Sequence, residues 1–263
     1  MRPTPPRVLA VGGSDSSGGA GIQADLKTAH ALGAHGLSVV CAVTAQDSHG
    51  VRASWPVPPD AVRAQLAAVL DDIGVDAVKT GMLPTGPVAA AVADALAGVT
   101  VPLVVDPVVA ASHGQELASA QAVAVIVERL LPLATVVTPN LAEAALLSGI
   151  QPDDEDSMAA AAARIHALGP RWVLVKGGHL AAEPVDILSG DGQVLRFPGE
   201  RVVSAHTHGT GCTMASAIAV GLATGLEVPA AVGQAKDYLT EAIRTGYPLG
   251  TGTGPVGHPA HWG

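Results

Sequence analysis

The chain has 263 residues, a net charge of −9 and an aromatic content of only 2%. This length is that of one large α/β domain, and an acidic chain without a basic run excludes nucleic acid and anionic membrane surfaces as expected partners. Two cysteines provide no disulfide framework, and the N-terminus lacks the apolar stretch of a signal peptide, so we expect a single cytoplasmic domain over residues 1–263.

Apolar runs alternate with helical segments along most of the chain. Strands are predicted at residues 7–11, 37–43, 77–79, 103–105, 135–137 and 172–176. Helices are predicted at residues 21–32, 59–73, 86–97, 118–130, 142–148, 156–168, 212–225 and 230–245. The strands are continuous Val, Leu and Ile runs, which is typical of parallel strands covered by helices on both faces. Residues 185–188 and 194–197 flank a Ser-Gly-Asp-Gly turn and predict a late β-hairpin, followed after residue 250 by an irregular tail.

Polar residues stand at or just after the ends of five predicted strands. They are Gln46, Lys79, Asp106, Asn140 and Lys176. The carboxyl ends of parallel strands share one edge of a sheet, and ligands of open α/β sheets bind there. Each segment alone also fits an ordinary turn. Together they predict one site at this edge.

A glycine loop precedes the seventh predicted helix, where residues 207–213 read Thr-His-Gly-Thr-Gly-Cys-Thr. A loop of this kind presents backbone N–H groups and the positive end of the helix dipole, which together favour phosphate or a phosphoryl group in transfer. Cys212 stands in the first turn, where the same field is expected to favour its thiolate. Cys41, within an apolar strand, is interpreted as a buried structural thiol.

A second glycine loop follows the first predicted strand. Gly19, Gly21 and Ala24 fit G-x-G-x-x-A, but the acidic residue that a dinucleotide site needs about twenty positions later is not cleanly placed. Asp15 in this loop either contacts a ligand or accepts hydrogen bonds from local backbone N–H groups in a turn. The loop by itself leaves both interpretations open.

Two carboxylates and a lysine follow later strands. Asp106 suits a metal site or a simple Asp-Pro turn. Asn140 and Glu143 have the spacing of a helix capping box, which is compatible with metal binding by Glu143. Lys176, in a chain with few lysines, suits polyphosphate. Three histidines match no usual zinc spacing and are interpreted as polar loop residues: His179, His206 and His208.

Seven ordered motifs together resemble the hydroxymethylpyrimidine/phosphomethylpyrimidine kinases of thiamine biosynthesis, within the ribokinase-like superfamily. They are GSDSSGGAGIQADLKT (13–28), AVTAQDSHGV (42–51), KTGML (79–83), VVDPV (104–108), VTPNLAEAALLSG (137–149), VLVKGGH (173–179) and HGTGCTMASAIA (208–219). The resemblance implies a three-layer α/β sandwich with a mostly parallel central sheet, and a homodimer. The chain departs from the family near its end, where Gly-Thr-Gly-Thr-Gly-Pro replaces a His-Gly-His-Gly-Pro-like segment.

The resemblance also implies roles for matching residues. Substrate contacts are expected from Gly13, Asp15, Gln46, Met82 and Val108. The anion hole and the catalytic base are expected from Gly209, Thr210, Gly211 and Cys212, with Cys212 as the base. ATP is expected to contact Lys176, Asn140 and Gly177, and Mg²⁺ to be held by Asp106 and Glu143. Residues 110–114 are predicted to form a mobile flap.

The expected activity is transfer of the ATP γ-phosphoryl group to 4-amino-5-hydroxymethyl-2-methylpyrimidine and then to its monophosphate. A pyridoxal kinase of the same fold is the nearest alternative. A pyrimidine- or nucleotide-binding protein without catalysis is a second, although binding alone does not require a lysine, two carboxylates and a loop cysteine. A nicotinamide oxidoreductase, based on the G-x-G-x-x-A match, is a third.

Overall fold

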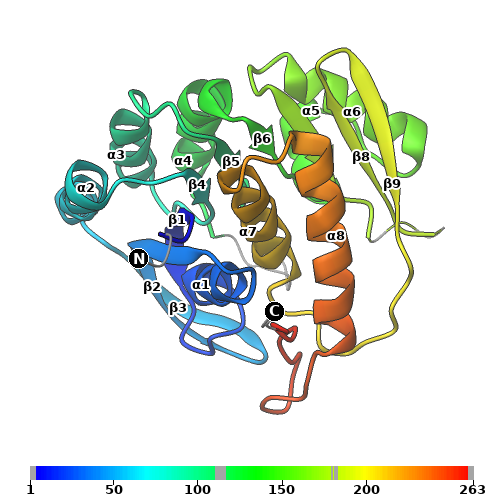
Figure 1. The fold of residues 1–263 in the computed structure, drawn as a ribbon, viewed down its shortest axis with the longest axis horizontal. Coiled ribbons are helices and arrows are strands. Elements are labelled where there is room, and N and C mark those ends of the chain that lie inside the picture. The colour runs from blue at the N-terminus through cyan, green and yellow to red at the C-terminus, as the bar shows by residue number, and fades with distance from the viewer. Residues whose placement is uncertain (1–3, 110–116, 179, 181–182, 260–263) are drawn as a thin grey trace.

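One twisted sheet forms the centre of the molecule (Figure 1). The computed structural model describes residues 4–109, 117–178, 180 and 183–259. Within these residues the parallel strands are β1 (Arg7–Ser14), β2 (His35–Asp47), β4 (Ala77–Thr80), β5 (Leu103–Val105), β6 (Val136–Val137) and β7 (Trp172–Val175). Three antiparallel strands complete the sheet, namely β3 (Gly50–Pro56), β8 (Val185–Gly190) and β9 (Gln193–Pro198). The strand order is β3-β2-β1-β4-β5-β6-β7-β8-β9.

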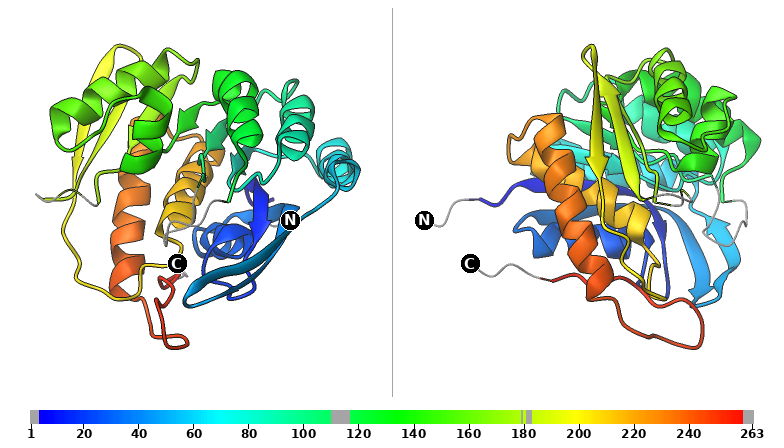
Figure 2. Two further views of the ribbon diagram at one scale, coloured as in Figure 1. Left: turned by 180° about the vertical axis from the view of Figure 1, so that it is seen from behind. Right: turned by 90° about the vertical axis from the view of Figure 1, so that its right-hand side faces the viewer.

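Helices cover both faces of this sheet, as the views from behind and from the side show (Figure 2). One layer contains α2 (Pro59–Ala68), α3 (Gly86–Leu96), α4 (Ala120–Val125), α5 (Leu141–Ser148) and α6 (Glu155–His166). The other contains α1 (Gly21–Ala31), α7 (Thr210–Ala223) and α8 (Val228–Arg244). Short π-helical segments Val69–Ile73 and Ile126–Leu130 extend α2 and α4, and a 3-10 turn spans Leu131–Leu133. The predicted three-layer ribokinase-like architecture is confirmed.

The continuous apolar strands are explained by two separate cores. Along β1, Leu9 and Val11 pack in the core beneath α2 and α3, whereas Val8 packs in the core beneath α7 and α8. Successive side chains of a strand point to opposite faces, so both sets must be apolar when helices cover both faces. The predicted six parallel strands and the late hairpin are confirmed on this basis.

Strand β3 is the element that sequence patterning missed. It pairs antiparallel with β2 and closes a hairpin at the edge of the sheet. Val51, Ala53 and Trp55 alternate with two polar residues, but only Val51 among these apolar side chains is buried, and Trp55 is 57% exposed. Backbone pairing to the long strand β2, rather than burial, therefore defines this edge strand.

The described residues after α8, up to residue 259, form no helix or strand, as predicted, yet they are bonded to the body of the protein. His208 donates its backbone N–H to Gly254 (3.1 Å) and accepts from Val256 (3.1 Å), and Gly257 donates to Ala242 (2.8 Å). His258 then lies beside Thr28 of α1 and Tyr238 of α8. No helix among the described residues is long and apolar enough to cross a membrane.

Burial of His258 predicts a loss of stability in mild acid. Burial, with a smaller contribution from Lys27, lowers the pKa of His258 to about 4 from its ordinary value of 6.5. Between these values the unfolded chain binds the proton and the folded chain does not, so stability falls as pH drops through that window. We expect His258→Gln to remove on the order of 2 kcal/mol of this pH dependence.

Urea unfolding at a series of pH values measures the effect. His166→Gln, at an exposed position on α6, is the matched control and should retain the wild-type dependence. Parallel pH profiles for wild type and His258→Gln would contradict the prediction.

Candidate functional site

The predicted convergence of strand ends is present at the carboxyl edge of the sheet. Lys176 Nζ lies 3.0 Å from Asp106 Oδ1, and Thr138 Oγ1 donates to the same oxygen at 3.1 Å. An isolated parallel β-bridge also joins the backbone of Asn140 to that of Lys176. Residues after β5, β6 and β7 are thereby assembled into one polar cluster.

The glycine loop before α7 faces this cluster. A Cβ atom on Gly211 would lie 3.6 Å from Lys176 Nζ and 3.7 Å from Asp106 Oδ2. Gly209 caps the helix in the left-handed conformation (φ 91°), and the first α-helical bond runs from Thr213 N–H to Gly209 O at 2.9 Å. The amides of Gly211 and Cys212 precede that bond and open the helix beside the lysine, which is the geometry of an anion site.

The two glycine loops abut each other. A Cβ atom on Gly209 would lie 1.9 Å from the carbonyl oxygen of Gly19, and Gly21 also has a positive φ of 56°. The glycines of the G-x-G-x-x-A segment therefore permit close approach between the starts of α1 and α7. This packing role accounts for the motif without a dinucleotide.

Cys212 lies where the sequence places it, but the expected thiolate is wrong for the protein without ligands. Burial raises the pKa of Cys212 to about 11, although the Lys79 cation and the backbone N–H of Gly21 act in the opposite direction. The desolvation of the thiolate outweighs the helix field. The resting form is a thiol. The expected location of Cys41 is confirmed, because its side chain is fully buried within β2.

A buried ion pair between Lys79 and Asp25 lies near Cys212. Lys79, only 1% exposed, contacts both oxygens of Asp25 at 2.8 and 3.0 Å. Ser216 of α7 donates to Asp25 at 2.7 Å. Burial acts to lower the pKa of Lys79, but the nearby carboxylate of Asp25 and other acidic groups raise it. Lys79 therefore joins α1, β4 and α7, and its ammonium group pairs with Asp25 rather than with a residue of the polar cluster around Lys176.

The capping interpretation of Asn140 and Glu143 is confirmed. Asn140 Oδ1 accepts from Glu143 N, and Glu143 Oε2 accepts from Asn140 N, both at 2.9 Å. Burial raises the pKa of Glu143 to about 7, with Lys176 lowering it and Asp106 raising it. A carboxyl group with this pKa is readily deprotonated by an arriving cation.

The residues in this cluster fit Mg²⁺. The ion takes few protein carboxylates and completes its shell with water and phosphate oxygens. Asp106 and Glu143 provide two acidic groups beside the anion site. Among the residues described, no group of three or more His, Cys, Asp and Glu side chains is arranged to hold a metal ion by itself. The chemistry of the donors therefore suits an ion shared with a bound phosphate.

Gly177 has a structural function that the sequence did not reveal. Its N–H donates to Asp186 Oδ1 at 2.9 Å, and the other oxygen of Asp186 pairs with Lys236 of α8. A Cβ atom on Gly177 would lie 1.9 Å from Val185 O. This contact orients the turn that carries Lys176.

The predicted substrate residues line the adjoining part of the same edge. A Cβ atom on Gly13 would lie 2.9 Å from Met82 Sδ, which places these two residues in contact. Val108, half-buried, donates its N–H to Asp106 O at 2.9 Å. Gln46 forms one wall of a hollow of about 250 Å³, whose lining residues are Ser17, Gln46, Asp47, Ser48, His208, Leu249, Gly250, Thr253 and Pro255.

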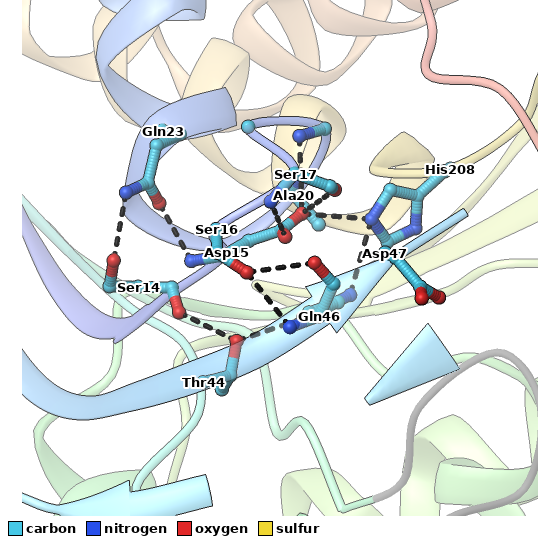
Figure 3. Close-up of polar contacts among 12 residues, drawn as sticks. Ser14, Asp15, Ser16, Ser17, Ala20, Gln23, Thr44, Gln46, Asp47 and His208 are labelled. Atoms are coloured by element: carbon cyan, nitrogen blue, oxygen red, sulfur yellow. Dashed lines mark hydrogen bonds and ion pairs between the residues drawn. The ribbon is translucent and has the colours of Figure 1, made fainter. Parts of the chain in front are cut away.

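Asp15 adopts the local turn that the sequence left as an alternative (Figure 3). Oδ1 accepts from Ser17 N at 2.8 Å, and Oδ2 accepts from Ala20 N at 2.7 Å and Gly19 N at 3.1 Å. Burial raises its pKa, but hydrogen bonds from His208, Ser17 and Ala20 prevail and lower it to about 2. Asp15 is therefore an ionised carboxylate that organises the loop.

His208 is the site residue that sequence reasoning missed. Its Nε2 lies 2.9 Å from Asp15 Oδ2 and 3.2 Å from the Gln46 side-chain nitrogen. His208 is a polar loop residue, as interpreted, but its side chain also joins the glycine loop before α7 to two residues of the predicted substrate region. Its partners are far away in sequence, so spacing gives no indication of them. His179 and the predicted flap at 110–114 lie outside the described residues.

Comparison with known proteins identifies the family and the fold of this chain. A family model for phosphomethylpyrimidine kinase matches residues 15–257. The chain is 56% identical over 255 residues to a hydroxymethylpyrimidine/phosphomethylpyrimidine kinase of Streptomyces coelicolor, covering 97% of this chain and 95% of that protein.

Two solved structures share the fold. A phosphomethylpyrimidine kinase from Clostridium difficile superposes with a TM-score of 0.81 at 40% identity, covering 90% of this chain and 99% of that one. The ADP complex of Bacillus subtilis pyridoxal kinase superposes with a TM-score of 0.90 at 39% identity, covering 98% of each chain. The chain therefore belongs to the phosphomethylpyrimidine kinase family and is a kinase with a ribokinase-like fold.

Proposed function

We propose that this kinase transfers the γ-phosphoryl group of ATP to 4-amino-5-hydroxymethyl-2-methylpyrimidine, and then to its monophosphate, for thiamine biosynthesis. The supporting observation is the position of Gly211 at the start of α7, beside the Lys176–Asp106 pair, while His208 of the same loop lines the hollow that Gln46 borders. The Streptomyces coelicolor relative, which is named for both pyrimidine activities, supports the choice of acceptor.

In the proposed reaction the protein contributes position and charge. Lys176 binds phosphate oxygens of ATP, with Asn140 and Gly177 orienting the turn around it. The amides of residues 209–212 stabilise the negative charge that develops on the transferred group. Cys212, in the fraction of molecules in which it is ionised to the thiolate, accepts the proton of the acceptor hydroxyl as that oxygen attacks. Asp106 and Glu143 would hold Mg²⁺, which neutralises charge on the phosphates when bound.

Glu143→Gln tests the metal assignment without removing the helix cap. A glutamine oxygen can still accept from Asn140 N, so α5 should remain intact. Loss of the negative charge is expected to raise the Mg²⁺ concentration for half-maximal activity about tenfold. Titration of Mg²⁺ at saturating ATP measures this value, and Glu128→Gln, at an exposed position, is the control. An unchanged Mg²⁺ requirement would remove Glu143 from the metal site.

The function is tested by ADP release with Mg-ATP and four conditions: the hydroxymethylpyrimidine, its monophosphate, pyridoxal and no acceptor. Turnover of both pyrimidines is the expected result. Turnover of pyridoxal alone would assign the protein as a vitamin B6 kinase, the candidate favoured by its close superposition on the Bacillus subtilis pyridoxal kinase. No acceptor-dependent ADP release would overturn the proposal.

We also propose a homodimer, as the family resemblance implies, and a cytoplasmic location, as the cysteine content favours. Light scattering after size-exclusion chromatography tests the assembly, and a monomeric mass would overturn it.

A further inference from the structure

The side chain of Gln46 is held at both ends by other residues (Figure 3). Its nitrogen lies 3.2 Å from His208 Nε2, and its oxygen lies 3.3 Å from Thr44 Oγ1. The backbone of Gln46 is fixed as well, because Ser16 Oγ accepts from Gln46 N at 2.8 Å and donates to Gln46 O at 2.7 Å. The amide therefore has little freedom except a half-turn that exchanges its nitrogen and oxygen.

The hydrogen-bond partners decide which of the two amide orientations is favourable. Asp15 is ionised and can only accept, so the 2.9 Å contact requires a proton on His208 Nε2. If the Gln46 nitrogen faced that N–H, two hydrogen-bond donors would point at each other, which is unfavourable. Thr44 gives its single hydroxyl proton to Ser14 O at 2.9 Å and can then only accept from Gln46. When the amide oxygen faces His208 and the nitrogen faces Thr44, the nitrogen donates to Thr44, and the single Nε2–H of His208 is shared between Asp15 at 2.9 Å and the Gln46 oxygen at 3.2 Å.

We propose that His208 is a positioning residue for acceptor specificity, whose Nε2–H holds the Gln46 side-chain oxygen so that the fixed amide reads the edge of an aminopyrimidine ring. This inference rests on the proposed function. In the held orientation Gln46 retains one N–H and one oxygen lone pair for a ligand. A 4-aminopyrimidine offers the matching pair, an amino donor next to a ring-nitrogen acceptor. Pyridoxal has no such adjacent pair, because the two carbon atoms that flank its ring nitrogen carry a methyl group and a hydrogen and no hydrogen-bond donor.

His208 is well placed for this function because its own position is fixed. Its backbone bonds on both sides to the segment at Gly254 and Val256. Its ring packs over Gly19, where a Cβ atom would lie 2.5 Å from His208 Cδ2, so the absence of a side chain there makes room for the imidazole. The side chain is 13% exposed. A donor fixed in this way discriminates between ligands because it prevents the amide from turning to suit a wrong one.

The test combines single variants with a double-mutant cycle. His208→Leu removes the donor, whereas Asp15 retains its bonds to Ser17, Gly19 and Ala20. We expect the Kd for the hydroxymethylpyrimidine, measured by calorimetry, and its KM to rise about tenfold, with kcat changed less than about threefold. The Kd for pyridoxal should not rise in parallel. His208→Gln, which retains an N–H donor, should recover part of the loss.

The cycle separates positioning from a general structural effect. In a Gln46→Leu background, His208→Leu should raise the pyrimidine Kd by less than about twofold, because the residue through which His208 acts is absent. An undiminished tenfold effect in that background, or equal losses for both ligands, would overturn the inference. Thermal unfolding of each variant identifies loss of fold. A wild-type protein that binds and phosphorylates no pyrimidine would instead overturn the proposed function, whatever the variants do.

Discussion

Cys212→Ala is expected to lower kcat by about 10²–10⁴-fold while acceptor binding is retained, because it removes the proposed proton acceptor from the start of α7. Cys212→Ser keeps the size of the side chain but supplies a far weaker base, so it should be nearly as inactive. Single-turnover kinetics measures the chemical step, and calorimetry measures acceptor binding separately.

The pH dependence provides a second test of Cys212. Because burial raises its pKa to about 11, only a small fraction is ionised at neutral pH in the free protein. The ionised fraction grows as pH rises, so wild-type kcat/KM should increase from about pH 6 to about pH 9. The Cys212→Ser profile should lack this increase. Cys41→Ala is the matched control, since it removes the other thiol from a strand core away from the site. Turnover at the wild-type level in Cys212→Ala would refute the base assignment.

Gly209→Ala is expected to damage both stability and activity. The new Cβ atom would lie 1.9 Å from Gly19 O, and alanine disfavours the φ of 91° at this position. Strain and the forced separation of two backbone segments should together lower the free energy of unfolding by about 4 kcal/mol. Displacement of the amides at the start of α7 should reduce kcat by about 10²-fold or more.

Gly225→Ala provides a matched control at the other end of α7. Gly225 has almost the same φ, 88°, but its Cβ position has no neighbour within 4 Å. Its replacement should therefore lower stability by only about 1 kcal/mol and leave turnover unchanged. Chemical denaturation and steady-state kinetics compare the two variants. Equal losses would show that backbone strain alone, and not the contact with Gly19, explains the effect at Gly209.

Much of the fold was predictable because its patterns are local. A strand that is covered by helices on both faces must be apolar along its whole length, and this pattern identified the six parallel strands. The Ser-Gly-Asp-Gly turn identified the late hairpin. Edge strand β3 was not predicted, because it is short, its side chains are mostly exposed and backbone pairing to β2 stabilises it. The cluster of Asp106, Lys176 and the loop at Gly211 was also accessible, since the carboxyl ends of parallel strands must meet.

The sequence by itself determined the fold class, the edge that carries the site and the residue types available there. Only the tertiary structure decided how those residues are used. Burial of Cys212 reversed the expected ionisation, because desolvation depends on atoms contributed by the whole fold. Lys79 forms an ion pair with Asp25. The His208 side chain contacts Asp15 and Gln46. All of these contacts join segments that are distant in the sequence. Local spacing encodes helices, turns and caps, whereas protonation and long-range pairing exist only once the chain has packed.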